Sequence, residues 1–393
     1  MKFTVKRAEM LKAVKTALKA VGGLEEISVT KDLLIEANSG NGIVSVTGTD
    51  LQTRIQCRVK ALNIAEDGGV VLKPLLSNML RLSDGDVVEF STDSLQKNTV
   101  NIRCGNICYN VPFIDANEYP KADMPFPQDM ICVQGINSLI NRTAFAAGTN
   151  IPEARHKVLE FVKIKFNGSG ATAEATNGIY IAVSDAAHCS DGQLELLIHQ
   201  KAIKMLSEII SADETLYIGT AGRFAVFMRQ DMIFHTMLSN EQFVDTGRVI
   251  NGLSPQYQAT CDAKALYNLI SNVTTILGDK DDRCVNLAIE EGKVTAYCIT
   301  AKGCAKDSVE ALQRTPTPTD GFNFEPRLLL DCLHRMSGPI EIFFNAKGYL
   351  LIVGNQSRYL VGPRKPAVIT VSEPKEKKPK AEKKSKKTVA KAA

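Results

Sequence analysis

The 393-residue chain is long enough for two to four domains, since a domain usually holds about 100 to 200 residues. Its residues are 44% hydrophobic and 23% charged, which is typical of globular proteins, and no apolar run approaches the about 18 residues that a membrane span needs. The net charge of +4 hides an asymmetry, because residues 373–393 hold nine Lys and three Glu, which leaves about −2 for the rest of the chain.

The chain begins MKFTVKRAEMLKAVK, which has the positive charges of a signal peptide but not the continuous apolar stretch that must follow them. A cytoplasmic protein without a membrane segment is therefore expected. The ten cysteines lie mostly in apolar segments that resemble strands, and none forms a CxxC pair. In that compartment, reduced and buried thiols are favoured over disulfides.

The first predicted element is a helix over residues 8–21 (AEMLKAVKTALKAV), where apolar residues recur at spacings of three and four. Lysines repeat this spacing one position further on and form a cationic stripe of Lys12, Lys15 and Lys19. Such a stripe suits DNA phosphates, which attract lysine without regard to sequence. Taken alone, however, the stripe is better explained as an ordinary solvated helix face.

Helical patterns like this first one return at residues 136–147 and 263–277, and strand-like pairs follow each of them. A second helical pattern begins near Lys73, Lys201 and Pro326, at spacings of 128 and 125 residues, and each copy precedes a run of three strands. The repeat therefore predicts an α+β protein of three similar domains, because each unit is long enough to bury its own core.

Proline-rich segments at 113–128 and 249–257 mark the linkers. We expect domains at residues 1–125, 126–253 and 254–372, followed by a disordered Lys-rich tail at 373–393.

Further basic residues lie on the second domain's predicted helices: Arg142, Lys201 and Lys204. The third domain offers the weaker set of Lys264, Arg327 and Arg335. Because no aromatic ladder accompanies these charges, contact with a duplex backbone is favoured over stacking on single strands.

The chain lacks the common signatures of enzymes: a phosphate-binding loop, a dinucleotide-binding glycine motif, a nucleophile elbow or an HExxH motif. A partial calcium-loop pattern at Asp279, Asp281 and Glu290 has Cys284 where the loop needs glycine. We therefore expect no catalytic residue, no cofactor and no metal. A site assembled from distant residues between repeats stays open as an alternative.

Five segments resemble the bacterial DNA polymerase III β-subunit family, the sliding clamps, in the same order along the chain. They are MKFTV at the start, VSVTGTDLQTRIQCRV (44–59), EATNGIYIAV (174–183), FVDTGRV (243–249) and YLVGP (359–363). No single segment is specific, but together they cover essentially the whole chain apart from the tail.

The resemblance implies a ring-shaped homodimer in which two protomers join head to tail around duplex DNA, with helices lining the bore and antiparallel sheets outside. It also implies a short-peptide motif in the partners, which are the replicative polymerase and the clamp loader. The implied dimer interface joins Tyr109 and Val111 of one protomer to Ile276 and Leu277 of the other. Alternatively, Ile276 and Leu277 only complete a local core.

The family's partner-peptide pocket can be carried over position by position. It comprises Thr176, Gly178, Ile179, Tyr180, Ile181, Val244, Arg248, Val249, Leu360, Gly362, Pro363 and Arg364. Several positions depart from the family pattern: the usual His-Arg pair is Ile179 and Tyr180, the usual proline is Val244, and two usual methionines are Gly362 and Arg364. Leu24 stands where many members place a DNA-contacting arginine. Loss of adaptable methionine predicts a different peptide preference.

The sequence therefore supports two functions of different kinds. A sliding clamp would confer processivity by enclosing DNA and has no chemistry of its own. A non-ring scaffold would bind DNA through the Lys-rich tail, which composition alone also supports.

Overall fold

The protein is described here from a computed structural model, which places residues 1–22, 28–92, 98–120, 125–152, 154–168, 170–186, 192–278, 283–300, 303–318 and 320–365. The predicted tail at 373–393 lies outside these residues, as do Leu24, Asp279 and Asp281. No helix in the described ranges is long and apolar enough to cross a membrane.

The first unit begins with a strand and alternates helices with strand runs. Its elements are β1 (Lys2–Lys6), α1 (Arg7–Ala17), η1 (Leu18–Ala20), η2 (Ser28–Lys31), β2 (Leu33–Asn38), β3 (Ile43–Thr49), β4 (Thr53–Lys60), β5 (Asn63–Glu66), β6 (Gly68–Leu72), α2 (Leu76–Leu82), β7 (Val87–Thr92), β8 (Thr99–Cys104), β9 (Ile107–Pro112), β10 (Ile114–Asp115) and η3 (Ala116–Glu118).

The second unit repeats this order. Its elements are β11 (Ile131–Gln134), α3 (Ile136–Thr143), η4 (Ala144–Ala146), η5 (Ala154–Glu160), β12 (Phe161–Asn167), β13 (Ala171–Thr176), β14 (Tyr180–Ala186), β15 (Gln193–His199), α4 (Gln200–Ile209), β16 (Thr215–Ala221), β17 (Phe224–Arg229) and β18 (Met232–Met237).

A linker with a short helix leads to the third unit. The elements are α5 (Thr246–Asn251), β19 (Pro255–Asp262), α6 (Ala263–Val273), η6 (Thr274–Ile276), β20 (Val285–Glu290), β21 (Lys293–Thr300), β22 (Gly303–Glu310), β23 (Leu312–Thr315), β24 (Phe322–Phe324), α7 (Pro326–Leu333), β25 (Pro339–Asn345), β26 (Leu350–Gly354) and β27 (Ser357–Val361).

The predicted α+β repeat of three similar units is confirmed, with small shifts at the helix ends. Each first helix continues into a short 3-10 turn: η1, η4 and η6 extend α1, α3 and α6. The helix expected from Lys73 begins instead at Leu76, because Pro74 is followed by a turn before regular hydrogen bonding starts.

The strands form four antiparallel sheets, and two of these cross from one unit into the next. One nine-stranded sheet has the order β10-β6-β2-β3-β4-β18-β17-β16-β11, and the other has the order β15-β12-β13-β14-β27-β26-β25-β19-β23. Pairing of β4 with β18, and of β14 with β27, therefore joins neighbouring units through backbone hydrogen bonds. A five-stranded sheet (β5-β1-β7-β8-β9) and a four-stranded sheet (β22-β21-β20-β24) complete the fold.

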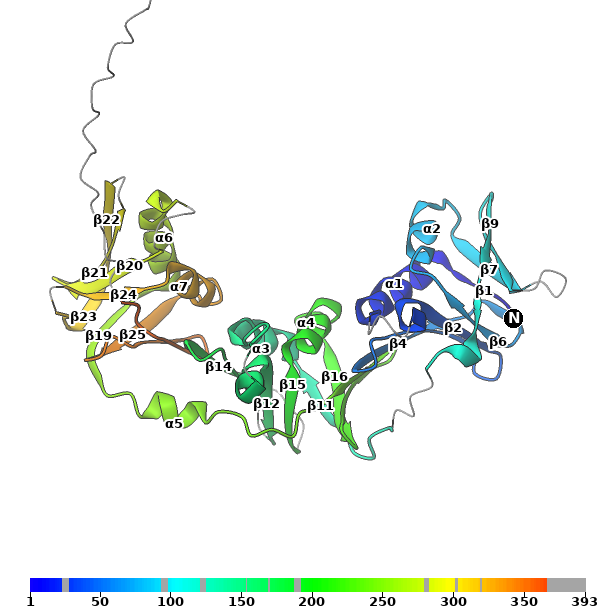
Figure 1. The fold of residues 1–393 in the computed structure, drawn as a ribbon, viewed down its shortest axis with the longest axis horizontal. Helices are drawn as coiled ribbons and strands as arrows, with labels where there is room; N and C mark the ends of the chain where they lie inside the picture. The colour runs from blue at the N-terminus through cyan, green and yellow to red at the C-terminus, as the bar shows by residue number, and fades with distance from the viewer. Residues whose placement is uncertain are drawn as a thin grey trace, which may run out of the picture.

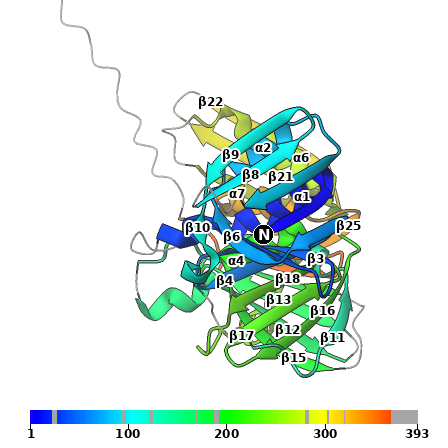
Figure 2. The same ribbon diagram turned by 90° about the vertical axis from the view of Figure 1, so that its right-hand side faces the viewer.

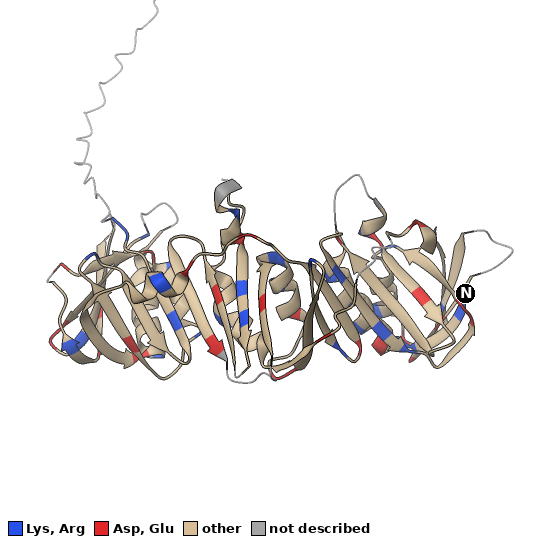
Figure 3. Ribbon diagram, turned by 90° about the horizontal axis from the view of Figure 1, so that it is seen from below, with Lys and Arg blue, Asp and Glu red and all other residues tan. Residues whose placement is uncertain are grey.

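The three units follow one another along an arc (Figure 1). The helices α1, α2, α3, α4, α6 and α7 lie toward the concave side, while the sheets and the linker containing α5 form the convex side (Figure 1). Apolar side chains between helices and sheets make one continuous core through all three units. The outward strand faces carry Lys and Arg interspersed with Asp and Glu, so the convex surface has no single sign of charge (Figure 3). Viewed from the end of the arc that holds the first unit, the strands of the second unit lie below those of the first unit (Figure 2).

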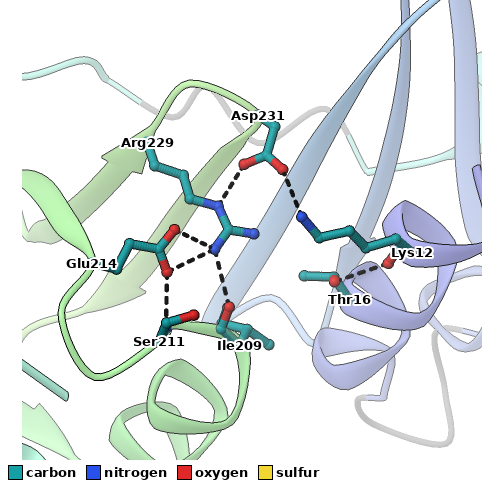
Figure 4. Close-up of polar contacts among 7 residues, drawn as sticks. All are labelled: Lys12, Thr16, Ile209, Ser211, Glu214, Arg229 and Asp231. Atoms are coloured by element: carbon teal, nitrogen blue, oxygen red, sulfur yellow. Dashed lines mark hydrogen bonds and ion pairs between the residues drawn. The ribbon is translucent and has the colours of Figure 1, made fainter. Parts of the chain in front are cut away.

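Ion pairs reinforce the junction between the first and second units (Figure 4). Lys12 on α1 lies 3.3 Å from Asp231, in the turn between β17 and β18. Arg229 is 12% exposed and bonds both Asp231 at 2.5 Å and Glu214 at 2.8 Å. Burial alone would raise the pKa of Asp231, but Arg229 and Lys12 outweigh it and hold that pKa below its usual value.

The junction between the second and third units uses arginines and an aromatic ring. Arg142 on α3 donates to the carbonyls of Asn355 and Asp185, both at 3.1 Å. Arg335, next to the end of α7, donates to the carbonyl of Asn141 at 2.8 Å, and its guanidinium lies 4.1 Å from the centre of the Phe145 ring.

His235 on β18 makes the first junction sensitive to acid. It pairs with Arg54 on β4, is 7% exposed, and neither ring nitrogen has a hydrogen-bond partner. Burial, together with the smaller effect of the Arg54 charge, lowers its pKa from 6.5 to about 4. The unfolded chain therefore binds a proton at higher pH than the folded chain does.

We expect stability to be full above pH 6.5 and to fall progressively as the pH drops toward 4, because only the unfolded state takes up the proton in that window. The loss should reach about 2–3 kcal/mol, since one pKa unit corresponds to about 1.4 kcal/mol. Urea unfolding across this range should show the slope in the wild type and a shallower one in His235→Leu. An equal slope in both proteins would contradict the assignment.

Candidate DNA-binding and partner-binding surfaces

The predicted DNA-binding lysines lie on helices of the concave side. Lys12, Lys15 and Lys19 belong to α1 and η1 of the first unit, and Lys201 and Lys204 belong to α4 of the second. The helices of two units that carry these five lysines thus lie on one side of the arc (Figure 1). This surface can hold polyanions by charge alone, because lysine binds phosphate as a point charge.

Ion pairs divide these lysines into two groups. Lys12 pairs with Asp231 as described, and Lys19 lies 2.5 Å from Glu208 on α4. Both pairs are largely solvated, so each contributes at most about 1 kcal/mol and a phosphate can compete with the carboxylate. Lys15, Lys201 and Lys204 show no ion pair within the described ranges and so offer their full charge.

Arg142 differs from the lysines because its guanidinium is already engaged. The two carbonyls that it bonds belong to the junction between the second and third units. Turning this side chain toward DNA would break both bonds. Its role in DNA binding therefore stays a prediction, and its observed role is to join two units.

The predicted partner pocket is built on a fixed turn between β13 and β14. The hydroxyl of Thr176 donates to the carbonyl of Tyr180 and accepts from the amide of Gly178. The side chain of Asn177 accepts from the amides of Ile179 and Tyr180. Gly178 has φ +88°, which favours glycine. The turn therefore holds Ile179 in the open, 61% exposed.

A small apolar cluster separate from the main core lies beside this turn. Its buried members are Ile181, Val183, Ile250, Leu351 and Leu360. Val249 on α5 is 45% exposed. Ile179 and Val249 are thus two exposed apolar side chains next to a buried apolar cluster.

Tyr180 is on the opposite side of its strand. It packs in the main core, and its hydroxyl donates to the carbonyl of Phe145 at 2.8 Å. Burial raises its pKa to about 12, and the nearby Cys332 and Asp331 raise it too. The structure therefore places only the backbone of Tyr180 near the predicted pocket, since neighbouring residues on a strand face opposite ways.

Val183, Ile250 and Leu351 pack with the predicted pocket residues Ile181 and Leu360 and were not among the residues predicted from sequence. The alternation of Ile181 and Val183 along one strand was the available signal. Nothing in the sequence indicated that Ile250 of the linker covers the same face.

Two departures from the family pattern have a structural basis. A Cβ at Gly362 would lie 2.9 Å from the carbonyl oxygen of Ile179, and the Gly362 amide bonds that same carbonyl at 3.0 Å. Arg364 bonds the Glu325 carboxylate and the carbonyl of Arg283, so its side chain is engaged within its own third unit. The end of β27 is therefore tied closely to the turn before β14.

A hollow of about 620 Å³ lies next to Val244, but it is acidic. Its lining includes Glu174, Glu195, Glu241 and Asp245, while Lys163 pairs with Glu195 at 3.4 Å. No group of three or more His, Cys, Asp or Glu side chains in the described ranges is arranged to hold a metal ion.

The four residues predicted for the dimer interface lie at opposite ends of the arc. Tyr109 and Val111 are on β9 of the first unit, and Ile276 and Leu277 are at and after η6 of the third. All four are partly buried against the core of their own unit. Ile276 and Leu277 therefore complete a local core in part, and they also leave apolar surface exposed.

Comparison with known proteins gives one consistent result. The family model described as "DNA polymerase III beta subunit, N-terminal domain" matches residues 1–123. A beta sliding clamp from Caulobacter vibrioides is 25% identical over 354 residues, which cover 86% of this chain and 91% of that protein. One from Vibrio cholerae is 22% identical over 265 residues, 66% of this chain and 67% of that protein.

Solved structures share the fold across nearly the whole chain. A DNA polymerase sliding clamp from Bacillus subtilis matches with a TM-score of 0.83 at 21% identity, covering 93% of this chain and all of that one. A DNA polymerase III beta subunit from Thermotoga maritima matches with a TM-score of 0.82 at 19% identity and the same coverage.

Proposed function

Because this chain is a divergent member of the DNA polymerase III β-subunit family, the sliding clamps, we propose that it encircles duplex DNA as a ring of two protomers and tethers DNA-processing proteins there. The observation that best supports this proposal is the shape of the chain: it forms an arc, and the helices on its concave side carry lysines in two of the three units (Figure 1). Two such arcs joined head to tail enclose a bore lined by those helices.

The proposed ring acts by topology and not by chemistry. Lysine contacts to phosphate are weak and ignore sequence, so the ring slides while its closure prevents escape. A polymerase bound to the partner pocket then rebinds DNA as an intramolecular event at high effective concentration. The protein is thus a cytoplasmic processivity factor without a catalytic site or cofactor, and the clamp loader is a further partner.

The proposed seam of the ring joins Tyr109 and Val111 to Ile276 and Leu277 of the other protomer. Their position at opposite ends of the arc, with apolar surface left exposed, supports this pairing. The division into domains at 1–125, 126–253 and 254–372 belongs to the same proposal, with the Lys-rich tail outside the ring.

Replacing Lys15, Lys201 and Lys204 by Ala should weaken DNA binding uniformly across sequences. For each phosphate that a lysine no longer neutralises, the slope of log K against log salt should become shallower by about one. The comparison uses chains truncated after Lys365, so that tail lysines do not contribute, and fluorescence anisotropy on duplex DNA. Lys165→Ala on the convex β12 is the matched control. A triple variant with the control's slope would refute the assignment of the concave face.

Ile179→Glu and Val249→Glu should each weaken partner-peptide binding about tenfold or more, because a carboxylate replaces an exposed apolar contact. The probe is a labelled short peptide with adjacent Leu and Phe side chains, and the measurement is its dissociation constant. Tyr217→Glu, at a residue 48% exposed on β16, controls for added charge. Unchanged affinity in both pocket variants would place the peptide elsewhere.

A further inference from the structure

The two junctions between units are built on the same kind of turn. At the second junction, a Thr hydroxyl and an Asn side chain hold the turn before β14. In the turn between β3 and β4, the Thr49 hydroxyl likewise donates to the Thr53 carbonyl and accepts from the Leu51 amide. The Asp50 carboxylate accepts from the amides of Gln52 and Thr53. Leu51 has φ +73°, in the region that the glycine of the second turn also occupies. The two turns are therefore equivalent residue by residue.

The strand pairs after these turns also match, but their side chains do not. At the second junction, Ile181 is the second residue of β14 and lies opposite Leu360 on β27, and both belong to the buried apolar cluster. At the first junction, Arg54 is the second residue of β4 and lies opposite His235 on β18. A guanidinium and an imidazole thus occupy the positions where the predicted partner pocket has two apolar side chains.

Arg54 and His235 lie with Thr47 of β3 on the convex face of their sheet. The chain neighbours of these three residues pack in the main core, on the side that the helices cover: Val46, Ile55 and Phe234. Since neighbouring residues on a strand face opposite ways, the three polar side chains face away from the helices. In Figure 1 this is the outer side of the arc, opposite the lysine-bearing helices.

Buried polar atoms without hydrogen-bond partners gather at this place. His235 is 7% exposed, and both of its ring nitrogens lack a partner, as does the hydroxyl of Thr47. These are three of the five such atoms found in the described ranges. Arg54 is partly exposed and makes no hydrogen bond or ion pair in the described part of the chain. Because buried polar groups are nearly always paired, such a group of orphaned atoms indicates a missing partner.

The groups at this place can donate hydrogen bonds to an anion. Burial and, to a smaller extent, the Arg54 charge lower the pKa of His235, so its ring is neutral at pH 7 and carries one N–H. The Glu36 carboxylate acts on the Arg54 charge but, among the residues that the structure describes, forms no ion pair with it. Tyr119 donates to the Thr47 carbonyl at 3.4 Å, and burial raises its pKa to about 12, so it adds no negative charge.

We propose that Arg54, His235 and Thr47 form a second partner site, which binds a carboxylate side chain of an acidic peptide on the convex face of the first junction. The guanidinium holds the carboxylate, while the imidazole N–H and the Thr47 hydroxyl donate to it. A protein carboxylate fits this site better than a DNA phosphate, because the site faces away from the lysine-bearing helices. The first junction thus selects an acidic peptide where the second selects an apolar one. The site does not depend on whether two copies form a ring.

The test titrates an acidic peptide into the full chain and measures its dissociation constant by calorimetry at about 0.15 M salt. The peptide has two adjacent Glu between Leu residues and carries no charge at its ends. Arg54→Gln should weaken its binding about tenfold or more, because the carboxylate loses its charged partner. His235→Leu should weaken it about threefold to tenfold, because one neutral hydrogen bond is lost.

Arg58→Gln is the matched control. Arg58 is exposed, lies two positions after Arg54 on β4 and so shares its face, and its substitution removes the same charge. The Lys-rich tail is present in every protein compared, so its attraction for the peptide cancels. The peptide with adjacent Leu and Phe should bind all three variants as it binds the wild type, which also shows that they fold. If Arg54→Gln does not fold, His235→Leu decides.

Four outcomes would overturn the second partner site. Absence of acidic-peptide binding would show that ordered water satisfies these atoms, and equal weakening by Arg54→Gln and Arg58→Gln would show attraction by surface charge alone. Displacement of the peptide by inorganic phosphate at similar concentration would make this a site for small anions. Loss of binding in Ile179→Glu would place the acidic peptide at the second junction. Each outcome leaves the proposed clamp function standing, because that function is measured with the other peptide and with DNA.

Discussion

Leu277→Asp should convert the proposed dimer into monomers at micromolar concentration. The side chain is partly buried at the end of the third unit, where the seam would cover it on assembly. Burying an unpaired carboxylate in an apolar contact typically costs several kcal/mol, and about 3 kcal/mol at each seam corresponds to more than a hundredfold weaker association. Because a closed ring has two seams, both are weakened by one substitution.

Sedimentation or light scattering gives the mass of Leu277→Asp directly. Leu312→Asp, at a residue 68% exposed on β23 of the same unit, adds the same charge away from the seam and should stay dimeric. A circular dichroism spectrum checks that Leu277→Asp still folds. A folded variant that keeps the dimer mass would remove Leu277 from the interface.

Arg229→Ala should be the most destabilising single substitution considered for the body of the protein. It removes the ion-pair partner of Glu214, which is 23% exposed and keeps only its bond from the Ser211 amide, and one partner of Asp231. It also frees the Ile209 carbonyl. Breaking a buried pair by deleting one partner costs about 3–5 kcal/mol, and the partial exposure of Asp231 favours the lower end.

Thermal or urea unfolding measures this effect, and Arg223→Ala provides the control. Arg223 is an exposed arginine in the same unit, so its removal should change stability by less than about 0.5 kcal/mol. The substitution should also weaken the ion pair between Lys12 and Asp231, because Asp231 can reorient once Arg229 is absent (Figure 4). Equal stability of the two variants would show that the network contributes little.

The repeat in the sequence was enough to predict the units but not how they join. Helical stripes at a spacing near 127 residues predicted the first helices within a few residues, because those stripes pack on the sheet of their own unit. The merging of β4 with β18 left no sequence signal. Strand pairing across units depends on register and position in space, which local periodicity does not record.

For the candidate surfaces too, the sequence predicted local features but not contacts between distant residues. Spacing placed Lys12, Lys15 and Lys19 on one helix face. It could not show that Asp231 and Glu208, more than 180 residues away, pair with two of them. Strand alternation also predicts that Tyr180 and Ile181 face opposite sides of the strand. The family resemblance nevertheless assigns both residues to the pocket, because it compares sequence positions and not side-chain directions.

The most direct test of a ring around DNA is retention on closed circular duplex DNA, after loading, at a salt concentration that removes ordinary phosphate binders. The account predicts that the full chain and a chain truncated after Lys365 both stay on the circle, and that both leave when the DNA is cut once. Equal retention on circular and linear DNA, or release of the truncated chain from the circle, would contradict the ring and favour binding through the Lys-rich tail.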